Sequence, residues 1–439
     1  MRTRCWFVAL ATALLLPALA AAASPEATGS APADEARTRP EAAAEPPPPF
    51  RLTVEEARAR EQENALPLTP FYDAPEPWRP AKPGTLIRSE PCNDYRFPSD
   101  LAPADLGITT TRFLYHSRSV AGTDVPASGV ILLPNGTAPA LGWPVVVWAH
   151  GTSGVARAAA PSLMKDLYYG WEGLLQWPLL GYAVVAPDYA GLGTNAPHQY
   201  LAAPAQANDV LYAVAAARQA ARQLGSRWVA VGHSEGGLAV LKLAEVQARL
   251  KDPNCLGVIA IAPPGAWEAS LGAINDSMYR GYAAFVAFGL KAVYPDFEYG
   301  DLLTPEATKL MPVVKDHGWE VSMATFAYQV PPGRMLRADW KQNRRLRQFA
   351  ALSIPGAKAA GGPVLLLAGL ADATVPAKTV ELTFQQLRGQ GTAVEYRAYP
   401  GLDHDPLVFG SFRDQVRWVE ERFAGKPFTP GDHSPGTRR

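Results

Sequence analysis

The chain has 439 residues, and its 41 Lys and Arg residues balance its 41 Asp and Glu residues, so the formal net charge is zero. Without a net field to attract polyanions, we set aside binding to nucleic acid or to an anionic membrane surface. Hydrophobic residues make up 48% and charged residues 19% of the chain, which is the composition of a globular protein with a large buried core.

The first 23 residues have the pattern of an export signal. Arg2 and Arg4 give a charged start, Trp6–Leu19 is apolar, and Ala20–Ala23 is a run of small residues suited to cleavage. Pro17 and the short apolar length argue against the alternative, an uncleaved membrane anchor. We therefore predict a secreted or periplasmic protein without stable membrane insertion, and we expect it to be a monomer.

Residues 24–50 are rich in Ala, Pro and Glu and include four consecutive prolines, so we predict a disordered linker before a domain that begins at residue 51. Of the three cysteines, Cys5 would leave with the signal. Cys92 and Cys255 remain, an even number in an oxidising compartment, and the sequence leaves both a disulfide and two free thiols open.

After residue 100 the chain shows two kinds of strand pattern. Thr110–Ser117 and Ser128–Leu133 flank a polar turn containing Gly122 and predict an antiparallel hairpin. Six short runs of Val, Ile, Leu and other apolar residues follow, and such runs indicate strands buried on both faces of a mainly parallel sheet. These runs are Val145–Ala149, Ala183–Ala186, Trp228–Val231, Val258–Ala262, Val364–Leu367 and Ala393–Tyr399. The sequence thus predicts an α/β fold with a mostly parallel eight-stranded sheet.

Segments of helical length separate most of these runs: Pro204–Leu224, Glu235–Leu250, Pro376–Arg388 and Ser411–Phe423. The alternation breaks at residues 265–354, which hold aromatic-rich helical patterns and no convincing buried strand. We interpret them as a helical cap inserted between two parts of the core, residues 51–264 and 355–427. The polar, Pro- and Gly-rich residues 428–439 predict a disordered tail.

Gly232-His233-Ser234-Glu235-Gly236 has the G-x-S-x-G pattern of a nucleophile elbow. The serine of such an elbow lies on a sharp turn from strand to helix, where side chains at the flanking glycine positions would clash. The motif alone is weak, but here an apolar strand enters it and a helical pattern leaves it. We therefore interpret Ser234 as a nucleophile, against the alternative of a glycine-rich turn with an inert serine.

A serine hydroxyl needs an adjacent base, almost always histidine. In the α/β-hydrolases that carry this elbow the chain order is serine, acid, histidine, which leaves His317, His404 and His433. His433 lies in the polar tail and His317 within the cap. His404 follows the last predicted core strand, so we assign it as the base.

The acid should follow the strand before that one. Asp372 lies just beyond Val364–Leu367 and before a helix, where a carboxylate can hold the imidazole in the required tautomer. Asp403 and Asp405 are closer to His404 in sequence, but near neighbours in a loop seldom point at the imidazole. We assign Asp372 as the acid and leave the other two as solvated loop charges or supporting contacts.

The oxyanion of an acyl-transfer intermediate needs two backbone donors. We expect one from Glu235, at the start of the elbow helix, and the other from Thr152 in the loop after Val145–Ala149, with Ser153 as the alternative. His150 precedes the nucleophile in the chain, so we expect it to hold this loop through hydrogen bonds rather than act as a base.

No cofactor is predicted. Gly191 and Gly193 lack the third glycine of a dinucleotide-binding fingerprint, and no cluster of His, Cys, Asp and Glu has the spacing of a metal site.

Taken together, the sequence resembles the bacterial secretory lipase family of α/β-hydrolases. The matching segments are Pro83–Pro91, Trp143–Thr152 and Val184–Gly193, followed by the elbow, Asp372 and His404. The linker and much of the cap lie outside the resemblance. It implies hydrolysis of carboxylic esters, from short-chain esters to triacylglycerols, without a cofactor.

The chain departs from the family pattern at two positions. The family usually has Gln after the nucleophile, where this chain has Glu235, and a carboxylate there would oppose oxyanion charge if it pointed inward. The family often has a cysteine where this chain has Ala159, so its disulfide pattern does not transfer to Cys92 and Cys255.

The main prediction is therefore a secreted ester hydrolase acting on a small ester or lipid through an acyl-enzyme. An acyltransferase or peptidase on the same three residues is one alternative, and a non-catalytic binding protein on a hydrolase scaffold is another. Seven cap aromatics could line an acyl pocket, although forming the core of the cap is the more ordinary role for most of them. They are Trp267, Tyr279, Tyr282, Phe285, Phe288, Trp319 and Phe326.

Overall fold

The computed structural model describes residues 50–434, except 171, 172 and 266. The predicted signal, residues 24–49 of the predicted linker and residues 435–439 of the predicted tail lie outside this range. Phe50, which we had assigned to the linker, is buried, with 1% of its surface exposed. Its ring centroid lies 5.9 Å from that of Trp319, so the packed part of the chain includes residue 50.

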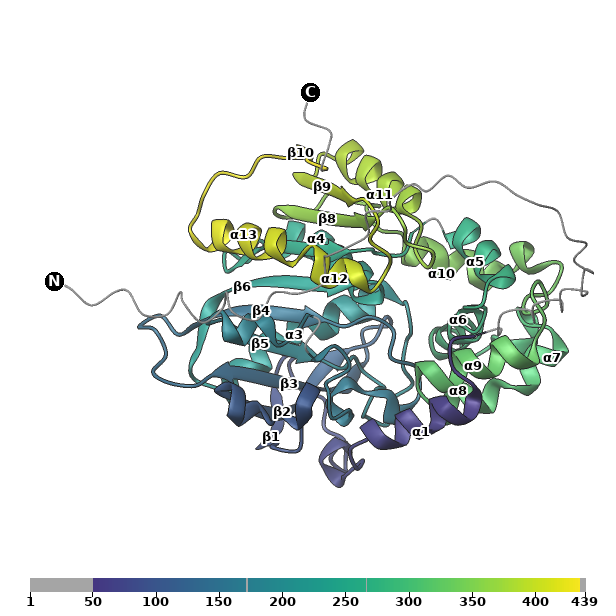
Figure 1. Cartoon of the computed structure of the whole chain (residues 1–439), viewed down its shortest axis with the longest axis horizontal. Coiled ribbons are helices and arrows are strands. Elements are labelled where there is room, and N and C mark those ends of the chain that lie inside the picture. Colours follow the sequence, from purple (N-terminus) through teal and green to yellow (C-terminus); the bar gives the residue numbers. More distant parts are fainter. Residues whose placement is uncertain (1–49, 171–172, 266, 435–439) are drawn as a thin grey trace, which may run out of the picture. The chain divides into compact units, whose positions relative to one another are not determined.

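A ten-stranded sheet with the strand order β1-β2-β3-β5-β4-β6-β7-β8-β9-β10 forms the centre of the described chain (Figure 1). The first three strands and the β3–β5 pair are antiparallel, and every pair from β5 to β10 is parallel. The strands are β1 (Leu86–Pro91), β2 (Ile108–Arg118), β3 (Asp124–Pro134), β4 (Trp143–Ala149), β5 (Ala183–Pro187), β6 (Leu224–His233), β7 (Cys255–Ile261), β8 (Val364–Gly369), β9 (Val394–Tyr399) and β10 (Gly431–Asp432).

All eight predicted strands are present, but the count of eight was wrong because each edge of the sheet carries one more. β1 is a half-buried edge strand with the polar centre Arg88-Ser89-Glu90, so it shows no apolar run. β10 is only two residues long and pairs with β9 through backbone hydrogen bonds. The prediction of disorder from residue 428 was therefore wrong for this segment, because backbone pairing leaves no hydrophobic pattern in the sequence.

Helices cover both faces of the sheet, and successive strand residues point into different clusters. Val145 and Val147 of β4 pack in the cluster that includes side chains of α3, α4 and α11. Val146 and Trp148 pack in the other cluster, with α2, α12 and α13. These helices are α2 (Gln176–Leu179), α3 (Ala203–Ala220), α4 (Glu235–Leu250), α11 (Ala377–Gly389), α12 (Pro406–Gly410) and α13 (Phe412–Phe423). Burial on both faces explains why the parallel strands read as continuous apolar runs.

Six further helices lie within residues 265–354, between β7 and β8, as the sequence predicted for a cap (Figure 1). They are α5 (Trp267–Asp276), α6 (Tyr282–Val293), α7 (Pro305–Lys309), α8 (Met311–Asp316), α9 (Trp319–Gln329) and α10 (Arg344–Leu352). They have their own hydrophobic cluster, which includes the fully buried rings of Phe285 and Phe326.

The N-terminal helix α1 (Val54–Asn64) also belongs to the cap cluster, through Ala57 and the adjoining Phe50. From the sequence we had assigned residues 51–264, which include this helix, to the hydrolase core. That assignment was wrong because α1 has a mostly charged sequence with few apolar positions, and its packing partner α9 lies some 260 residues later in the chain.

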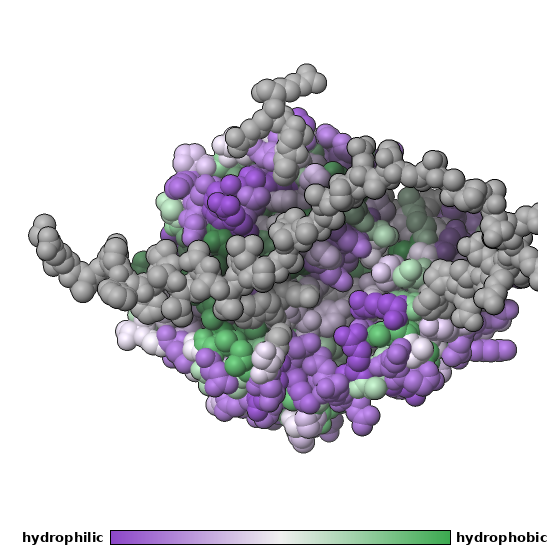
Figure 2. Space-filling model, viewed as in Figure 1, coloured by the Kyte–Doolittle hydropathy of each residue, from purple (hydrophilic) through white to green (hydrophobic). Residues whose placement is uncertain are grey.

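Two expectations from the sequence concern a disulfide bond and membrane insertion. Cys92 and Cys255 are both free thiols, so the disulfide that the sequence left open is not formed between them. None of the helices described for this chain is long and apolar enough to span a membrane. On the face seen in Figure 2, most of the visible described surface is hydrophilic, with smaller hydrophobic patches between.

Candidate active site

Ser234 lies at the turn between β6 and α4, as the elbow motif predicted. Its backbone is in the left-handed region, with φ 54° and ψ −118°, which is a strained conformation for a residue with a side chain. The two glycines of the motif make this turn possible. A Cβ on Gly232 would lie 2.2 Å from the carbonyl oxygen of Gly236, and a Cβ on Gly236 would lie 1.9 Å from that of Ala149.

His404 and Asp372 meet at the carboxyl edge of the sheet, although 32 residues separate them. Nδ1 of His404 lies 2.7 Å from Oδ2 of Asp372, and both residues are buried. The other carboxylate oxygen, Oδ1, accepts hydrogen bonds from the backbone N–H groups of Thr374 and Val375, at 2.9 and 2.7 Å. Since an ionised carboxylate can only accept, Nδ1 of His404 carries the proton in this pair. Nε2 of His404 is then the free acceptor, and it is buried with no hydrogen-bond partner among the described residues.

The surroundings of His404 favour its protonated form. Burial alone would lower the pKa of its imidazole, but the hydrogen bond and the charge of Asp372, with smaller contributions from Asp405 and Asp403, outweigh burial and raise the pKa above 6.5. The site thus stabilises the positive charge that a histidine base acquires when it takes a proton.

Asp403, which we had left as a solvated charge or a supporting contact, connects the loop that carries His404 to the loop that carries Asp372. Its Oδ1 accepts from the backbone N–H of His404 at 2.8 Å and from that of Ala373 at 3.1 Å. Asp405 is exposed.

The imidazole of His404 also packs beside the elbow. Its ring centroid lies 4.5 Å from that of His233, the residue that precedes Ser234. The structure therefore brings together the elbow, the proposed base and the proposed acid at the ends of β6, β9 and β8, which are parallel and end at the same edge of the sheet.

The loop after β4 is the one from which we expect a backbone donor to the oxyanion. Hydrogen bonds hold this loop at several positions. His150 is buried, and its Nε2 lies 3.2 Å from the carbonyl oxygen of Asp188. The Thr152 hydroxyl pairs with that of Tyr200 at 3.0 Å. The carbonyl oxygen of Ser153 accepts from the backbone N–H of Trp319 in the cap at 2.9 Å. His150 thus has the loop-holding contacts expected from the sequence.

Glu235 is the first residue of α4, where a backbone N–H has no acceptor within the helix. Its carboxylate is buried, accepts a hydrogen bond from Nε2 of Gln206, and has one oxygen 3.5 Å from Nε2 of His198. Neither Gln206 nor His198 was predicted from the sequence as a partner of Glu235. A signal was present in Gln206, because it and Asp209 are polar residues among the mostly apolar buried positions of α3.

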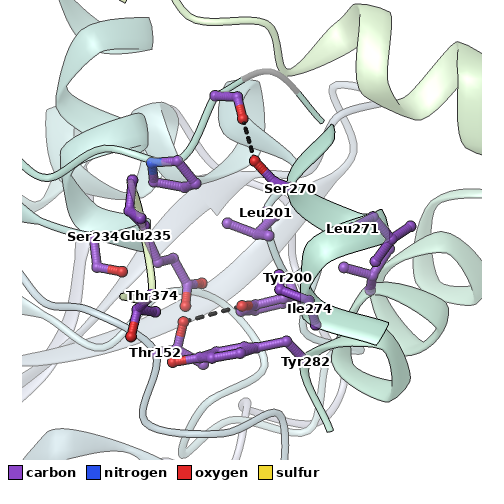
Figure 3. A pocket seen from close by; sticks show the side chains of 14 residues that line it. Thr152, Tyr200, Leu201, Ser234, Glu235, Ser270, Leu271, Ile274, Tyr282 and Thr374 are labelled. Atoms are coloured by element: carbon purple, nitrogen blue, oxygen red, sulfur yellow. Dashed lines mark hydrogen bonds between the residues drawn. The ribbon is translucent and has the colours of Figure 1, made fainter. Parts of the chain in front are cut away.

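A pocket opens beside Ser234 (Figure 3). Thr152, Ser234 and Glu235 line it together with Tyr282 from the cap. In Figure 3, Ser234 and Glu235 lie on one side of the pocket and Leu271 and Ile274 of α5 on the other. Its apolar lining includes Leu201, Pro264, Leu271, Ile274, Val286 and Val375.

Of the six cap aromatics whose side chains the structure describes, Tyr282 lines this pocket. Phe285 and Phe326 are buried in the core of the cap, and Tyr279, Phe288 and Trp319 pack against it. The side chain of Trp267 lies outside what the structure describes. Tyr200 and Leu201, which precede α3, also line the pocket and were missed.

Among the described residues, one group of three side chains could hold a metal ion: His233, His404 and Asp405, whose ligand atoms lie within 4.8 Å of one another. Both imidazoles already use Nδ1, in His233 for Tyr169 and in His404 for Asp372. A metal here would take the Nε2 atom that a histidine base needs, so we assign no metal to this group.

Sequence comparison shows which known proteins this chain is similar to. The sequence model of the family described as secretory lipase matches residues 161–431, which is more than half of the chain. A probable inactive lipase of Mycobacterium tuberculosis is 23% identical over 400 residues, with 83% of each chain covered. A secreted triacylglycerol lipase of Malassezia globosa is 23% identical over 390 residues, with 82% of each chain covered.

Solved structures of lipases and esterases share the fold. Candida antarctica lipase A in its closed state has a TM-score of 0.68 and 16% identity, with 83% of this chain and 89% of that chain covered. The rice cell wall degrading esterase LipA of Xanthomonas oryzae has a TM-score of 0.63 and 21% identity, with 78% of this chain and 98% of that chain covered. At these identities the likeness shows the fold alone.

Proposed function

The chain belongs to the secretory lipase family, and from that premise we propose that it is an exported, monomeric carboxylic ester hydrolase with Ser234, His404 and Asp372 as its catalytic triad. Membership and fold make it a hydrolase of the lipase type, and the family's substrates are small esters or lipids. The triad, the acyl-enzyme and the export signal are the parts that we propose.

The hydrogen bond between His404 Nδ1 and Asp372 Oδ2, at 2.7 Å, is the observation that supports the triad most strongly. It leaves Nε2 of the same imidazole free to accept a proton, beside an elbow whose serine lines an apolar pocket. A serine becomes a useful nucleophile only with such a base, and a base works only in this tautomer.

In the proposed reaction, Nε2 of His404 takes the proton of the Ser234 hydroxyl as its oxygen attacks the ester carbonyl. The backbone N–H groups of Thr152 and Glu235 stabilise the oxyanion, and the imidazolium then protonates the leaving alcohol. Water activated by the same imidazole adds to the acyl-enzyme, and its collapse releases the acid and restores the serine. Asp372 stabilises the imidazolium in both halves of the reaction.

The carboxylate of Glu235 does not prevent this role for its backbone. Gln206 donates a hydrogen bond to the carboxylate, and Nε2 of His198 lies 3.5 Å from it. The oxyanion would be stabilised by the N–H of Glu235, at the positive end of the helix dipole of α4, and not by its side chain.

Replacement of Ser234 tests the proposal. Ser234→Ala should abolish release of p-nitrophenol from acyl esters, whereas Ser270→Ala, which changes another serine of the pocket lining, should retain turnover. Circular dichroism would show that both variants are folded. Undiminished turnover by Ser234→Ala would refute the assignment of the nucleophile.

The non-catalytic alternative has one observation in its favour, namely a relative whose name describes it as a probable inactive lipase. A fluorophosphonate probe separates the two functions, because it reacts only with an activated serine. Labelling that is lost in Ser234→Ala supports the hydrolase, and failure to label the folded wild-type protein favours a binding protein. Product analysis with an added alcohol would separate acyl transfer from hydrolysis.

A further inference from the structure

We propose that Tyr169 is a positioning residue that sets the spacing between the two backbone segments of the oxyanion site. This inference rests on the proposed ester hydrolysis and extends it to a residue that is neither one of the proposed triad nor one of the residues that line the pocket. Tyr169 lies in the segment between β4 and α2, outside the elbow and outside the loop after β4.

The hydroxyl of Tyr169 bridges those two segments. The backbone N–H of Gly151, in the loop after β4, donates to this hydroxyl at 3.1 Å. The same oxygen lies 2.5 Å from Nδ1 of His233, the last residue of β6. Gly151 directly precedes Thr152, and His233 is two residues before Glu235, so the bridge joins the neighbours of both proposed oxyanion donors.

The directions of the two hydrogen bonds follow from the groups involved. The amide of Gly151 can only donate, so the Tyr169 oxygen accepts there and its own proton is available for His233 Nδ1. Burial lowers the pKa of His233, which keeps its ring neutral and able to accept. Burial also raises the pKa of Tyr169, so its hydroxyl keeps the proton that it donates. Each hydrogen bond therefore has one donor and one acceptor: the Gly151 N–H donates to the Tyr169 oxygen, and the Tyr169 O–H donates to Nδ1 of His233.

The glycine at position 151 fits this close approach. A Cβ at this position would lie 2.4 Å from the Tyr169 oxygen and 3.4 Å from Nδ1 of His233. Since a side chain at position 151 would force the Tyr169 hydroxyl to shift, the glycine permits this close approach, and the hydroxyl acts as a spacer between the two segments.

The backbone that presents Tyr169 is itself constrained. Leu167 and Tyr168 have φ values of 57° and 67°, in a region that residues with a Cβ rarely adopt. Asp166 holds this turn by accepting from the backbone N–H of Tyr168 at 2.8 Å and from the side chain of Asn64 in α1 at 2.9 Å. Tyr168 in turn donates its hydroxyl to the carbonyl oxygen of Thr152. The hydroxyls of Tyr168 and Tyr169, which follow one strained turn, thus both form hydrogen bonds with the loop after β4.

His233 connects this bridge to the proposed base, because its ring packs on that of His404. A change in the length of the bridge would therefore move the elbow relative to both the oxyanion loop and the imidazole. Such a shift affects the tetrahedral state, in which the donors must lie close to the oxyanion, more than it affects binding of the uncharged ester.

The test compares Tyr169→Phe with Tyr115→Phe as a matched control. Tyr115 is fully buried and its hydroxyl donates to the carbonyl oxygen of Asp209 at 2.8 Å, so its loss removes one buried hydrogen bond elsewhere in the sheet. Tyr169→Phe should lower kcat on p-nitrophenyl esters roughly 10- to 100-fold with KM within about twofold, since a misplacement of about 1 Å costs about that much in rate. Tyr115→Phe should leave both constants unchanged.

Two further measurements distinguish positioning from loss of stability. Affinity for a trifluoromethyl ketone, which forms a tetrahedral adduct with the serine, should fall in Tyr169→Phe by the same factor as kcat/KM. His233→Leu breaks the bridge from its other end. If Tyr169 and His233 act through one link, the double variant should lose little more than His233→Leu alone, whereas independent effects multiply. Should Tyr169→Phe fail to fold, the ketone affinity of His233→Leu still tests the bridge.

The outcomes separate this inference from the proposed function. If the wild type hydrolyses esters and Ser234→Ala does not, an unchanged kcat in folded Tyr169→Phe overturns the positioning role alone. Losses that multiply in the double variant, or an unchanged ketone affinity in His233→Leu, overturn it as well. If the folded wild type hydrolyses no ester and no fluorophosphonate labels it, the proposed function itself has failed.

Discussion

Gly236→Ala is the substitution whose effect follows most directly from the structure. Gly236 is the last residue of the elbow motif, and a Cβ at this position would lie 1.9 Å from the carbonyl oxygen of Ala149. Ordinary van der Waals contact begins at 3.4 Å, so α4 and the end of β4 would have to separate by about 1.5 Å. The loop proposed to bind the oxyanion follows Ala149 directly, and Ser234 precedes Gly236 by two residues.

The separation would move the two proposed donors apart. We expect kcat/KM for a p-nitrophenyl ester to fall by about 100-fold or more, because misplacement by about 1 Å costs about that factor. Overpacking of this kind should also lower the free energy of unfolding by about 1–3 kcal/mol. Kinetics at 25 °C and urea unfolding would measure the two effects.

Gly389→Ala is the matched control, because it makes the same chemical change at the end of α11, where a Cβ meets no heavy atom of the described residues within 4 Å. It should leave kcat/KM unchanged. A Gly236→Ala protein with wild-type kcat/KM and wild-type stability would refute the steric argument for the elbow.

Two other predictions concern the base and the cap. Since the pKa of His404 is raised and only its neutral form accepts a proton, kcat/KM should fall toward acid pH with a midpoint above 6.5; a midpoint at or below 6.5 in a pH-stat assay contradicts this. Glu61→Ala removes the acceptor of the Gly318 N–H, 3.1 Å away, next to the Trp319 N–H that donates to Ser153. It should cost about 1 kcal/mol of local stability and speed hydrogen exchange of the Gly318 and Trp319 amides, and unchanged exchange would show that Glu61 does not hold this contact.

The fold was predictable because its strongest signals are local. The six buried strands appear as apolar runs, and α4 has the same bounds in the structure as in the prediction, Glu235–Leu250. The α/β-hydrolase fold and the family are confirmed. The two edge strands were missed because neither shows an apolar run, since β1 has a polar centre and β10 is two residues long. Helix α1 was misassigned because its packing partner is remote in the chain.

The sequence indicated which loops form the candidate site but not the contacts that support them. Ser234, Asp372 and His404 follow from strand order and loop position, and the structure places the last two in hydrogen-bond contact. Nothing in the sequence indicated that Tyr169 bridges Gly151 and His233, since a tyrosine in a loop carries no pattern. Such contacts depend on which loops meet at the edge of the sheet, and only the folded chain brings them together.

A crystal structure of the protein inactivated by a fluorophosphonate would test the central claim most directly. The proposed triad predicts phosphorus bonded to the Ser234 Oγ, its non-bridging oxygen facing the backbone N–H groups of Thr152 and Glu235, and His404 Nε2 within hydrogen-bond distance of the adduct. A label on another residue, or a His404 ring turned away from the adduct, would contradict the proposed catalytic role of these residues.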